Sequence, residues 1–473
     1  MMKASMNPFS RREFFSASSK GLLGGAALAS LTSRSSALES SADVKSLNGS
    51  GFFRTENVSG KWFLLDPSGK PVYLRGANHY TDGTYMPLNL KERYGSQATW
   101  LASVRDRHRE WGFNYLPPSV GPSEHGDHVG PPKVNEQDPR KKWPNPVYRT
   151  PELPPETFAR LDYPFSLLLE FPKQYMSGRN LPDVFSKSFR DAVDKRCREV
   201  CEPLKDNPNL VGYHFCHNPP WHPTNKSFEY WIQETVHSGR PAHREWVKLM
   251  KRIYGSVELW NRTYGTPIDT FEEILEMKFP LRAYVLEAKG QRDRAAFMQQ
   301  ICEEWYKVYS ETIRKYDPNH LLLGDRNTGH LHPIPAYALH RMARYVDVLS
   351  TNTMGPSSMF FETLQQMTPH WDGPILLADT GAGIYNGEWS KSAYQCRNLE
   401  EYESLYKSYM TAGLEHPQLI GFAWCGYYET PSHRSGLVDS RDDEPLKERI
   451  EVVQKWNHWM RQQHGDMFDR LRK

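Results

Sequence analysis

The sequence predicts an α/β fold: a single (β/α)8 TIM barrel with an N-terminal β-hairpin and a helical insertion after strand four. Three observations support this prediction. The chain of 473 residues is long enough for one large barrel. Eight short apolar segments have the composition of buried strands. Most of them are followed by a segment with helical spacing of apolar residues, and this alternation is typical of a barrel with a parallel sheet.

The N-terminal hairpin is predicted from two apolar runs that flank a turn. The first run is Trp62–Asp66, the turn is Pro67–Lys70, and the second run continues to Tyr80. We expect the end of the second run, about Val72–Tyr80, to be the first barrel strand. The barrel domain is therefore predicted to cover residues 51–473.

The remaining elements are expected in alternating order. A Pro-rich segment at 121–155 is too long for a plain turn and is predicted to be a functional surface loop. The helical insertion is expected at 241–279. The other strands are predicted at 113–116, 165–172, from 210, 320–326, 346–352, 374–379 and 419–429. The other helices are predicted at 97–111, 189–204, 281–316, 335–344, 360–367, around 402–410 and from about 446.

Residues 1–37 have the features of an export signal. The segment Ser10–Phe15 contains two adjacent arginines and is similar to a twin-arginine motif. A weakly apolar run follows at 21–31, and Ser35–Ala37 is a small-residue cleavage site. We therefore expect an exported protein, periplasmic or extracellular, with a Ser-rich linker at 38–50. No later segment is apolar enough to cross a membrane.

Composition narrows the class of partner. Without residues 1–37 the formal net charge falls from +3 to −1, so no basic patch argues for nucleic acid. Aromatic residues make up 13% of the chain, which suits stacking on sugar rings or ordinary core packing. The six cysteines match no zinc spacing, and neither a cofactor nor a metal is expected. Cys197 and Cys201 are predicted core residues, and one disulfide among the six remains open.

Polar residues gather at the predicted C-terminal ends of the strands. In barrels of this type the loops after these strand ends build the active site. Each residue alone is also compatible with a helix cap or a loop hydrogen bond. The strand ends are Asn78-His79, Pro117, Glu170, His217-Asn218, Asp325-Arg326, Asn352, Asp379 and Trp424.

Six segments in the same order resemble retaining TIM-barrel glycoside hydrolases, in particular their agarase and β-galactosidase-like branch. The resemblance covers most of the chain after Gly51, and it implies a carbohydrate substrate or ligand, with an agar- or galactan-type β-linked sugar as one candidate. The six segments lie at 62–80, 181–215, 246–266, 317–326, 374–383 and 420–431.

The resemblance also implies where the catalytic groups belong. Such enzymes use two carboxylates about 5–5.5 Å apart, one as acid/base and one as nucleophile. Asp379 holds the nucleophile position, where the family has Glu. The acid/base position follows Asn218 and is occupied by Pro219, so the family's Asp-Asn-Glu is replaced by His217-Asn218-Pro219. A proline can neither donate nor accept the catalytic proton.

Sugar-binding positions match the family better. Asn218 stands where the family's Asn contacts the sugar hydroxyl beside the reacting carbon, and Trp424 stands where its Trp forms the floor of the subsite. The resemblance and the strand ends together give the predicted substrate-binding residues, which are Asn78, His79, Asn218, Trp221, Asp325, Arg326, Asn352, Trp389 and Trp424.

Three hypotheses follow. The first is a glycoside hydrolase with Asp379 as nucleophile or base and a relocated acid, Glu170, Glu429 or His217; a wider carboxyl gap would permit inversion. The second is a non-catalytic carbohydrate-binding barrel. The third is a metal-assisted hydrolase. Its ligands would come from the residues His125, Asp127, His128, His214, His217, His222, His330 and His332.

Overall fold

The computed structural model describes one compact unit within Leu47–Lys473. The predicted export signal, most of the linker and nearly all of the Pro-rich segment lie outside the described residues. No helix among the described residues is long and apolar enough to cross a membrane. The described residues are 49–80, 93–118, 155–169, 182–217, 219, 221, 240–276, 290–328, 334–355, 357–385, 387, 394–429, 435–439 and 442–472.

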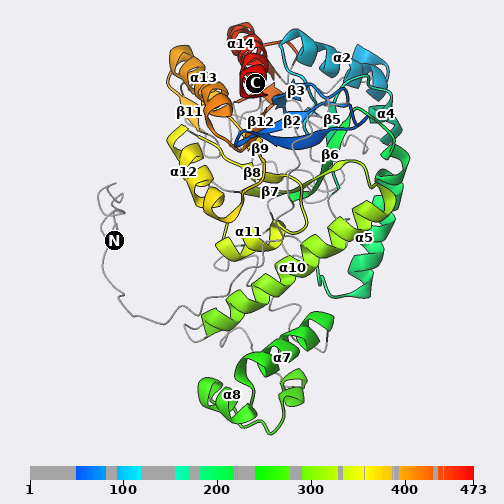
Figure 1. Ribbon diagram of the computed structural model, residues 1–473, viewed down its shortest axis with the longest axis vertical. Helices are drawn as coiled ribbons and strands as arrows, with labels where there is room; N and C mark the ends of the chain where they lie inside the picture. Colours follow the sequence, from blue (N-terminus) through cyan, green and yellow to red (C-terminus); the bar gives the residue numbers. More distant parts are fainter. Residues whose placement is uncertain are drawn as a thin grey trace, which may run out of the picture. The chain divides into compact units, whose positions relative to one another are not determined.

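Seven parallel strands form the central sheet, as the alternating pattern predicts (Figure 1). Their order follows the chain around the sheet, apart from the first strand, which pairs with the last. This is the order of a barrel whose first and last strands are neighbours. In spatial order the strands are β4 (Leu74–Ala77), β12 (Leu419–Trp424), β9 (Ile375–Thr380), β8 (Leu349–Asn352), β7 (Leu321–Thr328), β6 (Leu210–His217) and β5 (Phe165–Leu168).

The segment predicted as the second strand, Phe113–Leu116, connects the two edges of this sheet. The amides of Asn114 and Tyr115 donate to the Arg75 carbonyl of β4 at 2.9 and 3.3 Å. Leu116 forms a parallel bridge with Phe165 of β5. Close approach is possible because residue 76 is glycine; a Cβ there would lie 2.4 Å from the Tyr115 carbonyl oxygen. The predicted strand is thus reduced to a single bridge.

Side chains on the two faces of the sheet build two separate apolar clusters. The inner cluster contains Leu74 of β4, Val211 of β6, Leu323 of β7 and Leu376 of β9, together with Val348, which directly precedes β8. The outer cluster joins the strands to the surrounding helices (Figure 1). These helices are α2 (Gln97–Glu110), α4 (Pro155–Ala159), α5 (Lys187–Val200), α10 (Gln291–Tyr316), α11 (Ala336–Met342), α12 (Ser357–Met367), α13 (Leu399–Glu415) and α14 (Lys447–Arg472).

The helical insertion after the fourth predicted strand is confirmed within the described residues. It contains α7 (Pro241–Tyr254), α8 (Val257–Tyr264) and the 3-10 helix η4 (Phe271–Leu275). Pro241 is the first residue of α7, where its missing N–H costs nothing. In Figure 1 α7 and α8 lie beyond α10, away from the sheet, so the insertion adds no strand to the barrel.

The predicted N-terminal hairpin is also confirmed, and it has one more strand than expected. Strands β1 (Arg54–Val58), β2 (Lys61–Leu65) and β3 (Pro71–Val72) form an antiparallel sheet. The Asp66 carboxylate shapes the turn between β2 and β3, since it accepts hydrogen bonds from the amides of Ser68 and Lys70 at 2.9 and 3.0 Å.

The six cysteines are free thiols, and all of them are buried. Cys197 and Cys201 lie in the outer apolar cluster, as predicted. Burial raises the pKa of Cys201 and Cys302 well above the usual range. These thiols therefore stay protonated and pack as small apolar side chains.

Candidate active site

Asp379 is the penultimate residue of strand β9 and lies at the centre of the candidate site. Its Oδ2 is 3.1 Å from Nη2 of Arg326 and 3.7 Å from Nε2 of His79. Its Oδ1 accepts a hydrogen bond from Nδ2 of Asn78 at 3.1 Å. The three partners come from β7 and from the residues after β4, so the barrel brings the ends of separate strands together around one carboxylate.

The surrounding cations keep this carboxylate ionised. Burial by itself would raise the pKa of Asp379, but Arg326, His79 and His217 together hold that pKa well below its usual range. Arg326 is fully buried and also donates to the Ala378 carbonyl at 3.0 Å, which fixes its guanidinium against β9. The site therefore contains a positioned carboxylate that is ionised at neutral pH.

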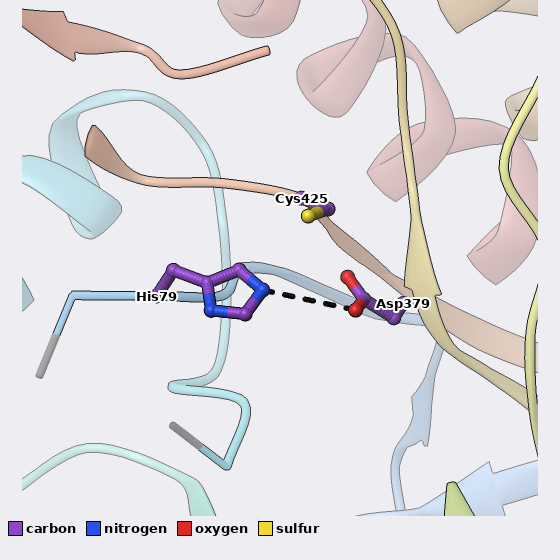
Figure 2. Close-up of side chains that lie close together, drawn as sticks. All are labelled: His79, Asp379 and Cys425. Atoms are coloured by element: carbon purple, nitrogen blue, oxygen red, sulfur yellow. Dashed lines mark ion pairs between the residues drawn. The ribbon is translucent and has the colours of Figure 1, made fainter. Parts of the chain in front are cut away.

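Figure 2 shows the imidazole of His79 directed at the Asp379 carboxylate, with the Cys425 sulfur beside both. Their nearest ligand atoms all lie within 4.8 Å of one another. Burial raises the pKa of the Cys425 thiol, and Asp379 adds to this effect. Cys425 was not among the predicted site residues, although it directly follows the predicted strand-eight residue Trp424.

The end of β6 contributes His217, one of the predicted relocated acids. His217 is partly exposed, and its Coulombic interaction with Asp379 helps to lower the pKa of that carboxyl. Pro219 is the residue predicted at the family's acid/base position, and its carbonyl accepts a hydrogen bond from the Trp221 amide at 3.0 Å. Asn218, Glu170 and Trp389 lie outside the described residues, so their predicted roles remain predictions.

Asp325 and Trp221 were predicted to contact the sugar, and the structure places both on the helix side of the barrel. Trp221 is buried, and its Nε1 donates to Asp325 Oδ2 at 3.2 Å. Trp305 and Tyr306 of α10 also donate to this carboxylate. Burial raises the pKa of Asp325 to about 7. The Asp325 carboxylate thus links α10 to β7 through buried hydrogen bonds.

Trp424 likewise faces the helices. It is fully buried against Tyr402, Tyr406 and Tyr409 of α13, and its Nε1 donates to the Ser435 carbonyl at 3.0 Å. Because successive strand residues point to opposite faces, Cys425 takes the side of the candidate site. The structure therefore gives Trp424 a packing role, whereas the sequence predicts a sugar platform.

Glu429 is the predicted acid that follows strand eight. Its Oε2 lies 2.7 Å from Nη1 of Arg449 and accepts a hydrogen bond from the Gly436 amide at 2.8 Å. Both contacts tie the Glu429 carboxylate to its immediate neighbours in a charge-assisted pair. Asn352, at the end of β8, is buried at 3% exposure.

The structure describes few of the residues that were predicted as metal ligands. Of its eight predicted ligands, only His214 and His217 belong to the described residues, and His214 is a buried side chain whose pKa burial lowers well below the usual range. The group His79, Asp379 and Cys425 is a different set with suitable ligand atoms. Arg326 already neutralises its only carboxylate, so a second cation there would be repelled.

Comparisons with known proteins agree with this architecture. The family model for β-galactosidase matches residues 173–368. β-Agarase B of Vibrio sp. (strain JT0107) is 22% identical over 88% of this chain, which spans about half (49%) of that relative's length. The structures of an exo-β-agarase and of an agarase each align over 88% of this chain and 66% of their own, with a TM-score of 0.66 at 19% identity. The resemblance to agarase and β-galactosidase-like TIM-barrel glycoside hydrolases is confirmed.

Proposed function

We propose that this protein is an exported glycoside hydrolase that cleaves a β-linked galactan of the agar type. The ionised carboxylate of Asp379 carries the proposal, because it lies at the strand end where the related enzymes place their nucleophile. Asn78, Arg326 and His79 fix its position at the C-terminal end of the sheet. The similarity to agarases over 88% of the chain supports the substrate class.

In the proposed mechanism Asp379 attacks the anomeric carbon or takes the proton of an attacking water. Aspartate is one methylene shorter than the family's glutamate, which reduces its reach by about 1.5 Å. A shorter reach favours the water-mediated route, in which the two groups stand farther apart and the product is inverted. His217 is the described residue that suits the role of proton donor to the leaving oxygen, because it is partly exposed and pairs with Arg326 across β6 and β7.

A second function is favoured by the same contacts. Both oxygens of Asp379 are engaged, one by Arg326 and one by Asn78, and Glu429 is paired with Arg449. Together with Pro219 in the acid/base position, this arrangement suits a barrel that binds galactan without cleaving it. The loss of a general acid alone reduces the rate by roughly 10²–10⁴-fold.

A polysaccharide panel distinguishes the two functions. Mature protein from Leu38 would be incubated with agar, other galactans and unrelated glucans, and both reducing ends and bound protein would be measured. Hydrolysis predicts product release that Asp379→Ala abolishes and that Asp206→Ala, a substitution at an exposed site, leaves unchanged. Binding without release in the wild type supports the second function. Absence of both on every polysaccharide contradicts both proposals.

Restoring the two family carboxylates gives an independent test. The double variant Pro219→Glu with Asp379→Glu should gain hydrolysis of any polysaccharide that the wild type binds, if the subsite is intact. The single variants should each show less, because the mechanism needs both groups. No gain in a folded double variant that still binds would show that the subsite holds the sugar in a different position.

Export is the part of the proposal that rests on the sequence alone. Replacement of both Arg11 and Arg12 by lysine should leave the protein in the cytoplasm, because the twin-arginine route requires the arginine pair. Cell fractionation followed by immunoblotting would detect this. An unchanged distribution would contradict the proposed route.

A further inference from the structure

A cavity of about 390 Å³ lies at the end of the barrel opposite the candidate active site. Its walls come from β3, from Tyr73 and Arg75 at the beginning of β4, from Gly112–Asn114 after α2 and from α14. Figure 1 shows α14 beside β3, and the two elements are in contact. The volume falls within the range of small-molecule sites, which is about 300–1,000 Å³.

The charges that line this cavity are all of one sign. Arg75, Arg109 and Arg461 contribute three guanidinium groups, and none of the eleven lining residues is acidic. Among the described residues, no carboxylate forms an ion pair with any of these three arginines. Burial lowers the pKa of the lining His464 to about 3, so this ring is neutral and adds no charge. The cavity therefore has a strongly positive potential.

Arg75 is the clearest sign of an incomplete site. Only 4% of it is exposed, and its Nε is buried without a hydrogen-bond partner. Its Nη1 donates to the Tyr73 carbonyl at 2.9 Å and its Nη2 reaches the Gly112 carbonyl at 3.5 Å, so its described partners are uncharged. Burial lowers the pKa of Arg75 to about 10, and Arg461 adds to this effect. Buried arginines are rarely left without an anion.

We propose that this cavity binds a small molecule that carries a sulfate or phosphate group. Guanidinium groups present planar pairs of N–H donors that match the oxygens of such anions. Three of them supply enough charge for a doubly negative group, which would also compensate the buried Arg75. The cavity is larger than a free oxyanion, so a sugar sulfate or sugar phosphate fits its volume. Because the site lies at the other end of the barrel, it is independent of the proposed hydrolysis.

Calorimetric titration with sodium sulfate and sodium phosphate tests this site, with sodium chloride at equal ionic strength as the reference. Wild-type protein should show saturable binding of one anion per chain. Arg109→Gln and Arg461→Gln remove exposed lining arginines, and each should weaken binding about tenfold, the loss expected for a charged hydrogen bond. The matched control Arg262→Gln removes an exposed arginine of α8 and should bind like the wild type.

A second titration identifies the source of the anion. Galactose 6-sulfate should bind more tightly than inorganic sulfate if the ligand is a sugar ester, and equally if it is a free anion, while galactose alone should not bind. Sulfate and phosphate isotherms that equal the chloride isotherm would overturn the proposal. Binding that survives in the Arg109→Gln, Arg461→Gln double variant would overturn it as well, because it would place the anion elsewhere.

Discussion

Two buried aspartates of the central sheet, Asp379 on β9 and Asp325 on β7, show how the surroundings of a residue decide its protonation. Asp379 faces Arg326 and His79, and these cations keep its pKa below the usual range. Asp325 is held by Trp221, Trp305 and Tyr306, which donate hydrogen bonds but carry no charge. Burial therefore dominates for Asp325 and raises its pKa to about 7.

Asp379→Asn should destabilise the protein, because it leaves Arg326 buried without a counter-ion. We expect a loss of about 3–5 kcal/mol in the free energy of unfolding at pH 7. The folded pKa of Asp379 is depressed, so its stabilisation is complete above the unfolded carboxyl pKa of about 3.9 and is lost as the pH falls further. Urea denaturation of both proteins between pH 3 and pH 7 would measure this; equal stability at pH 7 contradicts the prediction.

Asp325 should affect the pH dependence of the free energy of unfolding in the opposite sense to Asp379, and Asp325→Asn should remove this effect. The pKa of Asp325 in the folded protein is raised from 3.8 to about 7. The protonated carboxyl therefore stabilises the folded state fully below pH 4, and this stabilisation is lost as the pH rises to 7. The wild type should lose stability on the order of 4 kcal/mol relative to the variant over this range. Paired denaturation curves at pH 4 and pH 8 would show it, with the exposed Asp206→Asn as control. A parallel response of variant and wild type would contradict the prediction.

At the scale of the element, Gly324 decides which residues of β7 face the site. It has a φ of +63°, and the pairing of β6 with β7 shifts register beside it. Leu323 before it belongs to the inner cluster, and Arg326 after it faces Asp379. Strict alternation would place Asp325, not Arg326, on the side of Leu323. This irregularity therefore puts a cation at the candidate site.

Gly324→Ala should lower the free energy of unfolding by about 1–2 kcal/mol, the cost of a left-handed backbone for a residue with a Cβ. The added Cβ would also lie 3.1 Å from Cγ1 of Val346. Gly465→Ala is the matched control, because Gly465 lies within α14 with no atom within 4 Å of its Cβ position, and alanine should stabilise that helix by roughly 0.5–1 kcal/mol. Thermal or urea unfolding would compare the two; a stabilised Gly324→Ala would argue against strain at this position.

Substitution of Trp424 would measure how much the packing of β12 against α13 stabilises the protein. Trp424→Ala should cost about 3–5 kcal/mol of stability, since the ring fills the space between three tyrosines. Galactan affinity of the protein that remains folded should stay unchanged. If Trp424 were instead a sugar platform, the variant would keep its stability and lose affinity, and denaturation together with affinity electrophoresis would separate these outcomes.

At the scale of the whole unit, the N-terminal hairpin and the last helix hold each other in place. Phe63 and Leu65 of β2 form a separate apolar cluster with Phe468 of α14. The Phe63 and Phe468 rings meet edge to face with centroids 5.0 Å apart. Ser59 also donates to the Leu471 carbonyl at 3.0 Å. These contacts link the first strands and the last helix of the described chain.

Phe468→Ala should therefore weaken the whole unit, although it lies far from the candidate site. We expect a loss of about 3–5 kcal/mol, as for other buried phenylalanines. Phe361→Ala, at a position that is 37% exposed, should cost much less. Denaturation curves of both variants would check this, and catalytic or binding assays at low temperature should show intact function in the folded fraction. Equal effects of the two substitutions would contradict the assignment.

The sequence by itself determined the order and type of the elements, because apolar periodicity and turn residues are local properties. It also identified strand ends that meet around Asp379, among them Asn78, His79 and Arg326. Only the tertiary structure decided which side of each strand a residue occupies. It moved Asp325 and Trp424 to the helix side and brought Cys425 to the site. The reason is physical: one irregular residue such as Gly324 reverses strand alternation, and an ion pair between strands exists only once the sheet is formed.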